Sequence, residues 1–285
     1  ASFPTTKERM DKYKEDALTL SMRSVQDCLK KSSITKGDLT HLITVTCTGL
    51  HAPGLDLDLV QKLDLPYSIE RTNINFMGCY AAFNALKVAD AICQAKDSKV
   101  LVVCTELCTL HFQKGKSEDD LLANALFGDG SAAALVESTS NQKQCLYFEE
   151  YKCDILPSGK KEMTWGLGPL GFEMKLSSYV PDVIENGIQN LLGSFKSSFD
   201  HYAIHPGGKK ILRVIEEALG ISRERNAISH SVLKNYGNMS SPTILFILDQ
   251  ILTRSVPEEQ NKDILAMAFG PGITLESMIL KVKTN

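Results

Sequence analysis

The sequence predicts an α/β protein built from two similar halves that pack into one unit. Apolar runs typical of buried strands alternate with segments of helical spacing, an order that favours an α/β sheet. The succession of strand, buried helix with a polar residue at its amino end, strand, turn and strand occurs twice in the 285 residues. No low-complexity segment and no Pro/Ser-rich linker separates the copies. We therefore expect the halves, residues 1–145 and 146–285, to pack together.

The first half begins with an amphipathic helix, predicted for residues 7–31 from apolar residues at helical spacing among charges. Residues 41–47 are an apolar run that predicts a buried strand, and the loop 48–54 follows it. A short helix over 57–63 and a link through Pro66 lead to the helix after Cys79. Residues 99–107 predict a second buried strand, 118–125 a helix, 127–130 a turn, and 131–136 a strand that leaves the turn.

The second half repeats this order. Residues 146–153 predict a strand that crosses into it, and residues 201–205 predict another that ends before a Pro-Gly-Gly turn. A helix is expected over 209–219, closed by Gly220. Ser241 and Pro242 predict the start of a further helix over 243–252, because Ser caps helices and Pro is favoured in the first turn. The half ends with strands over 264–269 and 273–282, joined by the loop 270–272.

The stretch around Cys79 is the first candidate for chemistry. The residues after Cys79 are good helix formers that are apolar on nearly every face, which predicts a buried helix. Gly78 allows a sharp entry into that helix. The helix dipole and its free N–H groups favour negative charge, so we expect a lowered thiol pKa and a reactive thiolate. The alternative is an inert small hydrophobe, which is what most buried cysteines are.

Composition excludes several classes of function. A formal net charge of −3 with no basic block gives no support for binding to nucleic acid or to an anionic membrane. No apolar run reaches transmembrane length and no secretory signal opens the sequence. The eight cysteines are scattered through apolar segments and do not punctuate short loops, so we expect a reducing, cytoplasmic location.

His205 and Asn238 complete a catalytic set with Cys79. His205 lies at the carboxyl end of a predicted strand, where ligand sites of α/β sheets collect. Asn238 lies at a predicted helix entrance that matches the position of Cys79 in the first half. Taken singly, such a His is more often structural and such an Asn is more often a cap or turn residue. Together the three supply a nucleophile, a base and a neutral oxyanion donor, a set that suits acyl transfer from a thioester.

The same donors suit a decarboxylating condensation. His205 and Asn238 can stabilise the enolate that forms when a malonyl group loses carbon dioxide. Because an Asn takes up no proton, it fits such a site better than one that abstracts a proton. A zinc site at Cys104, Cys108 and His111 is the alternative, yet no second ligand pair at zinc-finger spacing accompanies them, so we predict no metal.

Five motifs carry a close resemblance to a known family. They are residues 75–86 with Gly78-Cys79, residues 125–133, His205-Pro206-Gly207-Gly208, residues 236–241, and Phe269-Gly270-Pro271-Gly272. These motifs resemble, in the same order, the signatures of type III polyketide synthases, the chalcone synthase-like members of the thiolase superfamily. The resemblance runs from about Leu39 to the end of the chain.

The resemblance implies the duplicated αβαβα five-layer thiolase fold, a homodimer, and an acyltransferase that needs no cofactor besides its CoA thioester substrates. It implies loading of an acyl-CoA starter on Cys79, decarboxylative condensation with malonyl-CoA, and cyclisation to a chalcone, pyrone or resorcinol/phloroglucinol-type product. His205 and Asn238 complete the triad, and Phe127 resembles the gatekeeper between the CoA tunnel and the cavity.

The remaining implied residues line the substrate cavity or bind CoA. The resemblance gives the cavity positions Cys47, Thr48, Cys108, His111, Trp165, Met174, Ser240, Gly270, Pro271 and Gly272. It gives the CoA-binding positions Gly207, Gly208, Lys209 and Lys210. Trp165 stands near a position that is usually Gly in plant chalcone synthases, and we expect it to shorten the cavity. Ala52 stands where a Met commonly reaches across the dimer interface, and we expect it to open a pocket for a long acyl starter. For both residues the alternative is simple repacking of the core.

The amino end departs from the family pattern. The chain opens at Ala1 without a Met and passes almost at once into a helix, so we expect upstream residues, which in the family add a strand and a helix and grip the CoA phosphates. Two rival functions remain open. One is a β-ketoacyl-acyl carrier protein synthase of the third type, which uses the same Cys, His and Asn. The other is a non-catalytic partner subunit, although such subunits typically lose the nucleophile.

Overall fold

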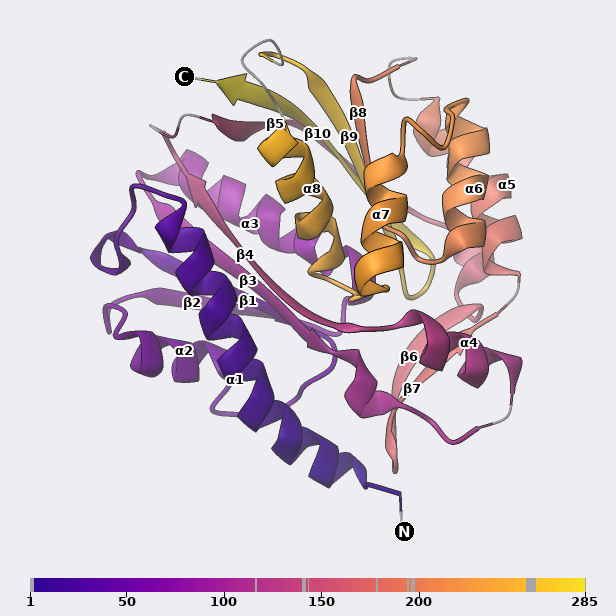
Figure 1. Cartoon of the computed structure of the whole chain (residues 1–285), viewed down its shortest axis with the longest axis horizontal. Helices are drawn as coiled ribbons and strands as arrows, with labels where there is room; N and C mark the ends of the chain where they lie inside the picture. Colours follow the sequence, from indigo (N-terminus) through magenta and orange to yellow (C-terminus); the bar gives the residue numbers. More distant parts are fainter. Residues whose placement is uncertain are drawn as a thin grey trace.

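The computed structural model describes residues 3–115, 117–139, 142, 144–177, 179–193, 195, 198–254 and 260–284. Within them, helices and strands alternate as predicted and form two four-stranded sheets with helices between and outside them (Figure 1). Within the described residues, no helix combines the length and the apolar character that a membrane crossing requires.

The first sheet has the strand order β2-β1-β3-β4. Strand β1 (His41–Thr46) lies between β2 (Glu70–Asn75) and β3 (Lys99–Leu107) and is parallel to both, and β4 (Asp129–Glu137) runs antiparallel to β3. All six residues of β1 are buried, as its apolar sequence predicts.

The second sheet repeats this arrangement with an extra edge strand. Strands β8 (His201–Ile204) and β9 (Asp263–Gly270) are parallel, β10 (Thr274–Thr284) is antiparallel to β9, and β5 (Gln144–Ile155) pairs with the outer edge of β10. The predicted boundary after residue 145 falls within β5. A separate hairpin, β6 (Met163–Gly168) and β7 (Gly171–Leu176), pairs with neither sheet.

The helices and sheets form five layers. Each half contributes two outer helices and one central helix: α1 (Thr6–Lys30), α2 (Leu55–Leu63) and central α3 (Ala81–Ala95) in the first, and α5 (Val180–Leu192), α6 (Lys209–Leu219) and central α8 (Thr243–Arg254) in the second. The main apolar core joins the two halves, because side chains of α3 and α8 pack there between the sheets. Two further cores lie under the outer helices. Helix α4 (Glu118–Leu126) contacts β7, and α7 (Ala227–Tyr236) packs on α8.

Local sequence explains where the helices begin and end. Thr5 caps α1, since its hydroxyl accepts from the Glu8 amide while the Glu8 carboxylate accepts from the Thr5 amide. Gly220 ends α6 in the left-handed conformation at φ 63°, as predicted.

Several predictions of local structure were wrong. The link through Pro66 contains β2, which the pattern did not indicate because this edge strand is mostly polar and exposed. The β6–β7 hairpin, α5 and α7 were not predicted. Strand β4 begins at Asp129, inside the predicted turn. The helix after Cys79 is not buried on every face, since Val88 on its outer side is 37% exposed.

Candidate active site

A cavity of about 90 Å³ lies beside Cys79, and residues of both halves line it. Most of the residues predicted to form a substrate site lie in this lining. They are Cys47, Thr48, Cys79, Cys108, His111, Phe127, Trp165, Met174, Gly207, Asn238, Ser240 and Pro271. Loops and turns far apart in the sequence therefore converge on one cavity.

Cys79 lies in a 3-10 turn, Gly78–Tyr80, that runs directly into α3. Gly78 has φ 76°, a conformation that other residues adopt only with strain, and it lies against Pro271 of the late loop. A Cβ atom added to Gly78 would lie 2.4 Å from Pro271 Cδ. The glycine therefore permits both the sharp entry to α3 and the close approach of the second half.

The predicted lowering of the Cys79 pKa was wrong for this structure. Burial raises the pKa of the thiol to about 11, although the side chains of Ser240 and Asn238 oppose the rise. Desolvation disfavours the charged form and here exceeds the effect of the helix amino end. Cys79 is thus a neutral thiol at pH 7 in the unliganded protein.

Asn238 presents an amide N–H to the sulfur of Cys79. Its Nδ2 and its Oδ1 each lie 3.9 Å from Cys79 Sγ, and Oδ1 also accepts a hydrogen bond from the Ser240 amide at 2.8 Å. The backbone of Asn238 is held by an isolated parallel bridge to Phe127. Its amide donates to Leu126 O at 2.9 Å, and its carbonyl accepts from the Gly128 amide at 3.0 Å. The bridge fixes Phe127 and Asn238 on the same cavity wall.

His205 follows β8 and is 1% exposed. It does not belong to the cavity lining, but it lies close enough to Asn238 for that amide to affect its protonation. Burial lowers the pKa of His205 to about 3, with the Asn238 side chain opposing the shift. Among the described residues, neither ring nitrogen has a hydrogen-bond partner. A buried imidazole that is neutral and unpartnered is available to accept a proton or to donate a hydrogen bond.

Glu106 is a buried carboxylate that the sequence reasoning did not single out. It is fully buried at the end of β3 and accepts hydrogen bonds from the Cys47 amide at 2.9 Å, the Thr48 hydroxyl at 2.7 Å and the Ser241 hydroxyl at 2.6 Å. Burial raises its pKa, and these donors oppose the rise. It therefore ties the end of β1 to the segment that carries Asn238. A charged residue inside an otherwise apolar strand was the available signal.

An aromatic cluster contributes His111 and Trp165 to the cavity wall, with Phe172 packed behind them. His111 stacks on Phe172 at 4.2 Å, and Trp165 meets both rings edge-on. The Trp165 indole N–H donates to the Cys47 carbonyl at 2.6 Å. His111 Nε2 donates to the Thr48 carbonyl at 2.7 Å while Nδ1 accepts from the Phe172 amide at 2.9 Å. Burial lowers the pKa of His111 to about 4, so the ring is neutral at pH 7.

The structure gives no support to the zinc alternative. Both ring nitrogens of His111 are engaged in hydrogen bonds, so neither is free to bind a metal. In the described part of the chain, no group of three or more His, Cys, Asp or Glu side chains is placed to hold a metal ion.

Some predicted site residues lie outside the cavity lining. Gly270 is buried at the end of β9, and Gly272 follows Pro271 at φ 76°. Gly208 precedes α6, whose first residues Lys209 and Lys210 are exposed. Lys210 Nζ lies 3.7 Å from Asp182 on α5. Ala52 is exposed in the loop after β1 and does not reach the cavity.

Known proteins similar to this chain are polyketide synthases. Residues 1–140 match the N-terminal domain of chalcone and stilbene synthases, and residues 149–284 match the C-terminal domain of the same family. The chain is 33% identical over 288 residues to probable polyketide synthase 1 of Dictyostelium discoideum, covering 95% of this chain and 9% of that protein. It is 32% identical over 290 residues to the alpha-pyrone synthesis polyketide synthase-like Pks18 of Mycobacterium tuberculosis, covering 98% of this chain and 74% of the relative.

Solved structures give the same result. The C-terminal type III polyketide synthase domain of Steely1 from Dictyostelium superposes with a TM-score of 0.91 at 30% identity, covering 98% of this chain and 80% of that one. PKS-I of the brown alga Ectocarpus siliculosus superposes with a TM-score of 0.92 at 30% identity, covering 98% and 78%. The two α/β halves described above thus match the predicted thiolase-like fold.

Proposed function

The chain belongs to the family of chalcone and stilbene synthases, which are type III polyketide synthases, and on that premise we propose that it makes a cyclised polyketide from CoA thioesters. In this proposal an acyl-CoA starter is loaded on Cys79 and extended with malonyl-CoA, with no further cofactor. The observation that carries the proposal is the approach of the Asn238 amide to Cys79 Sγ, at 3.9 Å, in a cavity that both residues line.

Loading begins with two neutral groups. With pKa values of about 11 for Cys79 and about 3 for His205, the thiol and the imidazole are both uncharged at pH 7. We propose that His205 takes the thiol proton as the sulfur attacks the thioester carbon. The oxyanion that forms accepts hydrogen bonds from the Asn238 amide and the new imidazolium. When the intermediate collapses, the CoA sulfur leaves and takes the proton back from His205.

Extension uses the same two donors. Loss of carbon dioxide from malonyl-CoA leaves its bonding electron pair on the α-carbon as an enolate, whose oxygen accepts from Asn238 Nδ2 and from the neutral His205 ring. The enolate carbon then attacks the Cys79 thioester and releases the sulfur. Asn238 suits this role because its carboxamide faces Cys79 Sγ, with Nδ2 at 3.9 Å, and the Ser240 amide fixes the carboxamide through its hydrogen bond to Oδ1.

The size of the cavity supports short products. Ligand pockets commonly measure roughly 300–1,000 Å³, whereas this cavity measures about 90 Å³. The hydrogen bond from the Trp165 indole to the Cys47 carbonyl fixes this side chain in the cavity wall. We propose that Trp165 limits the number of extensions. The expected effect of Trp165→Gly is a shift to longer products, and an unchanged product spectrum would count against this role.

The deciding experiment is mass spectrometry of products formed from a panel of aromatic and fatty acyl-CoAs with malonyl-CoA. We expect a cyclised product from the wild type and none from Cys79→Ala. A requirement for malonyl-acyl carrier protein would favour the carrier-protein-dependent synthase instead. If no acyl-CoA yields a product and none of them leaves an acyl group on Cys79, the chain is a partner subunit rather than a synthase.

Three finer features belong to the same proposal. A reducing cytoplasm is proposed as the location, because the eight cysteines are scattered through apolar segments and do not punctuate short loops. A homodimer is proposed from the family resemblance, and light scattering after gel filtration tests it.

Lys209 and Lys210 are proposed to bind CoA phosphate, because they are exposed just after Gly207 of the cavity lining. Their joint replacement by Ala is expected to raise the KM for acyl-CoA and leave kcat near the wild-type value.

A further inference from the structure

The β6–β7 hairpin carries Trp165 and Met174 into the cavity but has no sheet to support it. An isolated two-stranded hairpin is only marginally stable in water, so contacts with its surroundings must fix its position. Those contacts come from α1 and from the segment after β3. The first turns of α1 lie at the lower edge of the molecule near the hairpin (Figure 1).

Thr6 forms three hydrogen bonds with the turn of the hairpin. Its amide donates to the Pro169 carbonyl at 3.1 Å, its hydroxyl donates to the Gly168 carbonyl, and the same oxygen accepts from the Gly171 amide at 2.7 Å. One side chain thus bonds both ends of the turn that joins β6 to β7. Because Thr6 is the first residue of α1, the hairpin tip is fixed to the helix itself.

Arg9 binds the segment after β3, on either side of His111. It is 4% exposed, and Nη1 donates to the carbonyls of Leu110 and Phe112, the latter at 3.1 Å. These carbonyls flank His111, which stacks on Phe172 of β7. No carboxylate in the described residues forms an ion pair with Arg9, and its Nη2 is buried without a partner. Besides these carbonyls, the guanidinium lies over the Phe3 ring at 5.0 Å from its centroid. A buried cation without a carboxylate partner is costly, which argues for a positional role.

Gln113 links the segment after β3 to the β6–β7 hairpin. Its Nε2 donates to the carbonyls of Leu170 at 3.3 Å and Phe172 at 3.2 Å on the hairpin, and to the carbonyl of His111 at 3.2 Å. The side chain of Arg9 also packs against Gly171, where an added Cβ would lie 3.0 Å from Arg9 Cδ. The contacts that α1 makes with the hairpin therefore adjoin those that the segment after β3 makes with it.

We propose that Thr6 and Arg9 are positioning residues that set the length of the polyketide from outside the cavity. They do so by fixing the β6–β7 hairpin and the residues around His111 relative to each other. This rests on the proposed function, since it assumes that a growing chain occupies the cavity. Neither residue lines the cavity, so any effect they have on the product must pass through Trp165 and its neighbours.

The variants Thr6→Val and Arg9→Met test the proposal. Thr6→Val keeps the shape of the side chain and removes both hydroxyl hydrogen bonds, and Arg9→Met removes the guanidinium. Trp165 is the only tryptophan in the chain, so its fluorescence reports on the hairpin without any substrate. Loosening the hairpin is expected to shift the emission to the red and to raise the acrylamide quenching constant about twofold.

Product analysis is the second readout. We expect the ratio of longer products to the wild-type product to rise about threefold or more, while acyl loading on Cys79 stays within about twofold of wild type. Thr6→Ser and Arg9→Lys, which retain a donor, are expected to restore most of the wild-type pattern. Lys7→Met is the matched control, since Lys7 lies in the same turn and is exposed, with its Nζ on Asp11.

The outcomes separate this inference from the proposed function. Fluorescence and product length that both match wild type in the Thr6→Val and Arg9→Met variants overturn the positioning role. Changed fluorescence in a protein whose wild type yields no polyketide supports the hairpin contacts and refutes the proposed function. Changed fluorescence with an unchanged product pattern shows that hairpin position does not set product length, which also overturns the inference.

Discussion

Asn238 Nδ2 lies 3.9 Å from Cys79 Sγ, although the two residues are 159 positions apart and come from different halves of the chain. The backbone bridge between Asn238 and Phe127 fixes one side of this contact, and the close approach of Gly78 to Pro271 fixes the other. The geometry of the proposed site therefore depends on how the halves pack.

Gly78→Ala is expected to destabilise the protein by about 3 kcal/mol and to abolish activity. A methyl group there meets both the strain of φ 76° and a 2.4 Å contact with Pro271 Cδ. Urea denaturation measures the stability. Gly272→Ala is the matched control, because Gly272 has the same φ of 76° with nothing within 4 Å of an added Cβ. Equal losses in the two variants would mean that the contact with Pro271 contributes nothing.

The rate of Cys79 alkylation in the unliganded protein is expected to rise steadily with pH. With a pKa of about 11, the thiolate fraction grows about tenfold per pH unit between pH 7 and 9. Iodoacetamide labelling followed by mass spectrometry of the Cys79 peptide measures this, with Cys79→Ser as the blank. A rate that is already constant above pH 7 would instead indicate a thiolate stabilised by His205.

Glu106→Gln is expected to reduce the dependence of stability on pH. The folded pKa of Glu106 is raised above the ordinary 4.5, so the folded state binds more protons than the unfolded state between the two values. The contribution of Glu106 to stability therefore falls as pH rises through this window and grows as pH falls. The difference in unfolding free energy between wild type and Glu106→Gln should shift in favour of wild type on acidification from pH 7 to 5. A shift in the opposite direction would show that the folded pKa is lowered.

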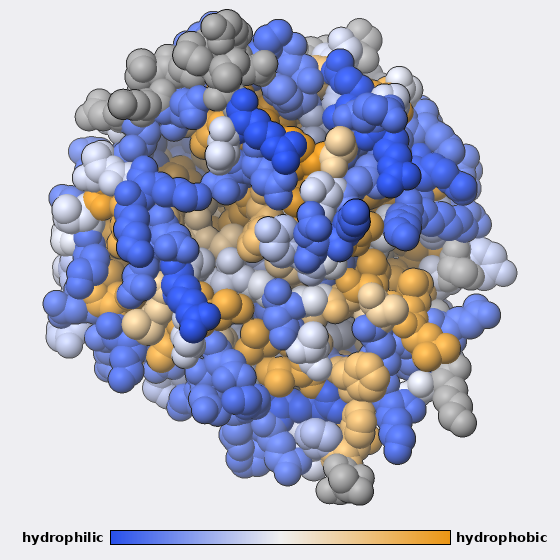
Figure 2. Space-filling model, in the orientation of Figure 1, coloured by the Kyte–Doolittle hydropathy of each residue, from blue (hydrophilic) through white to orange (hydrophobic). Residues whose placement is uncertain are grey.

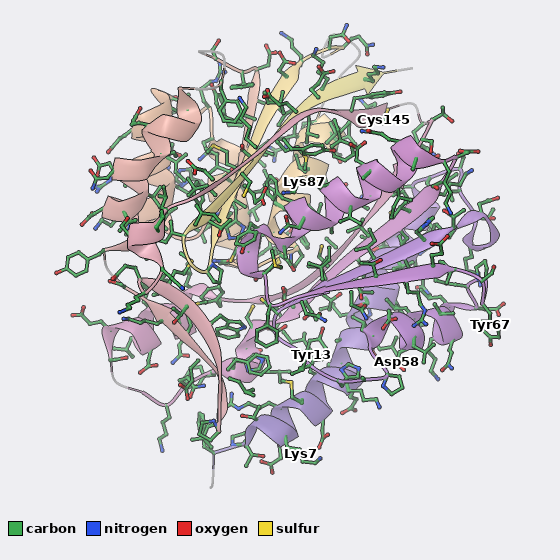
Figure 3. All side chains as sticks on the ribbon, turned by 180° about the vertical axis from the view of Figure 1, so that it is seen from behind. Lys7, Tyr13, Asp58, Tyr67, Lys87 and Cys145 are labelled. Carbon is green, nitrogen blue, oxygen red and sulfur yellow. The ribbon has the colours of Figure 1, made fainter. Side chains whose placement is uncertain are left out.

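Lys87→Met is expected to cost about 2–4 kcal/mol of stability, because it leaves a buried carboxylate unpaired. Lys87 on α3 donates to both carboxylate oxygens of Glu276 on β10 at 2.8 Å, and the Glu276 side chain is 4% exposed. Lys87 is labelled on α3 beside the strands of the second half in Figure 3.

The double variant Lys87→Met with Glu276→Gln is the control for this pair. It removes the carboxylate charge that the single variant leaves unpaired. Chemical denaturation should therefore show that part of the lost unfolding free energy is recovered. Equal instability of the single and double variants would mean that the carboxylate is not the source of the cost.

The sequence predicted most of the buried strands because their apolar runs are unambiguous, as in the fully buried β1. It did not predict β2, whose exposed polar residues form an edge, or the β6–β7 hairpin, which is interrupted by glycines. The surface of the molecule shows how mixed the outer elements are, with apolar side chains interspersed among hydrophilic ones (Figure 2).

Many of the predicted site residues lie around one cavity, but the electrostatics of the site did not follow from the sequence. Cys79 and Asn238 were predicted from matching helix starts, and the structure brings them together. The pKa of Cys79 could not be predicted, because desolvation depends on residues from both halves. Glu106 was missed for a similar reason, since its three closest donors come from two distant segments.

The independence of the hairpin from both sheets has an evolutionary consequence. Substitutions on β6 and β7 alter the wall that faces the cavity while leaving the backbone pairing of the two main sheets intact. Sequence change in this hairpin can therefore reshape one wall of the cavity while the packing of the two halves, and with it the contact between Cys79 and Asn238, is kept.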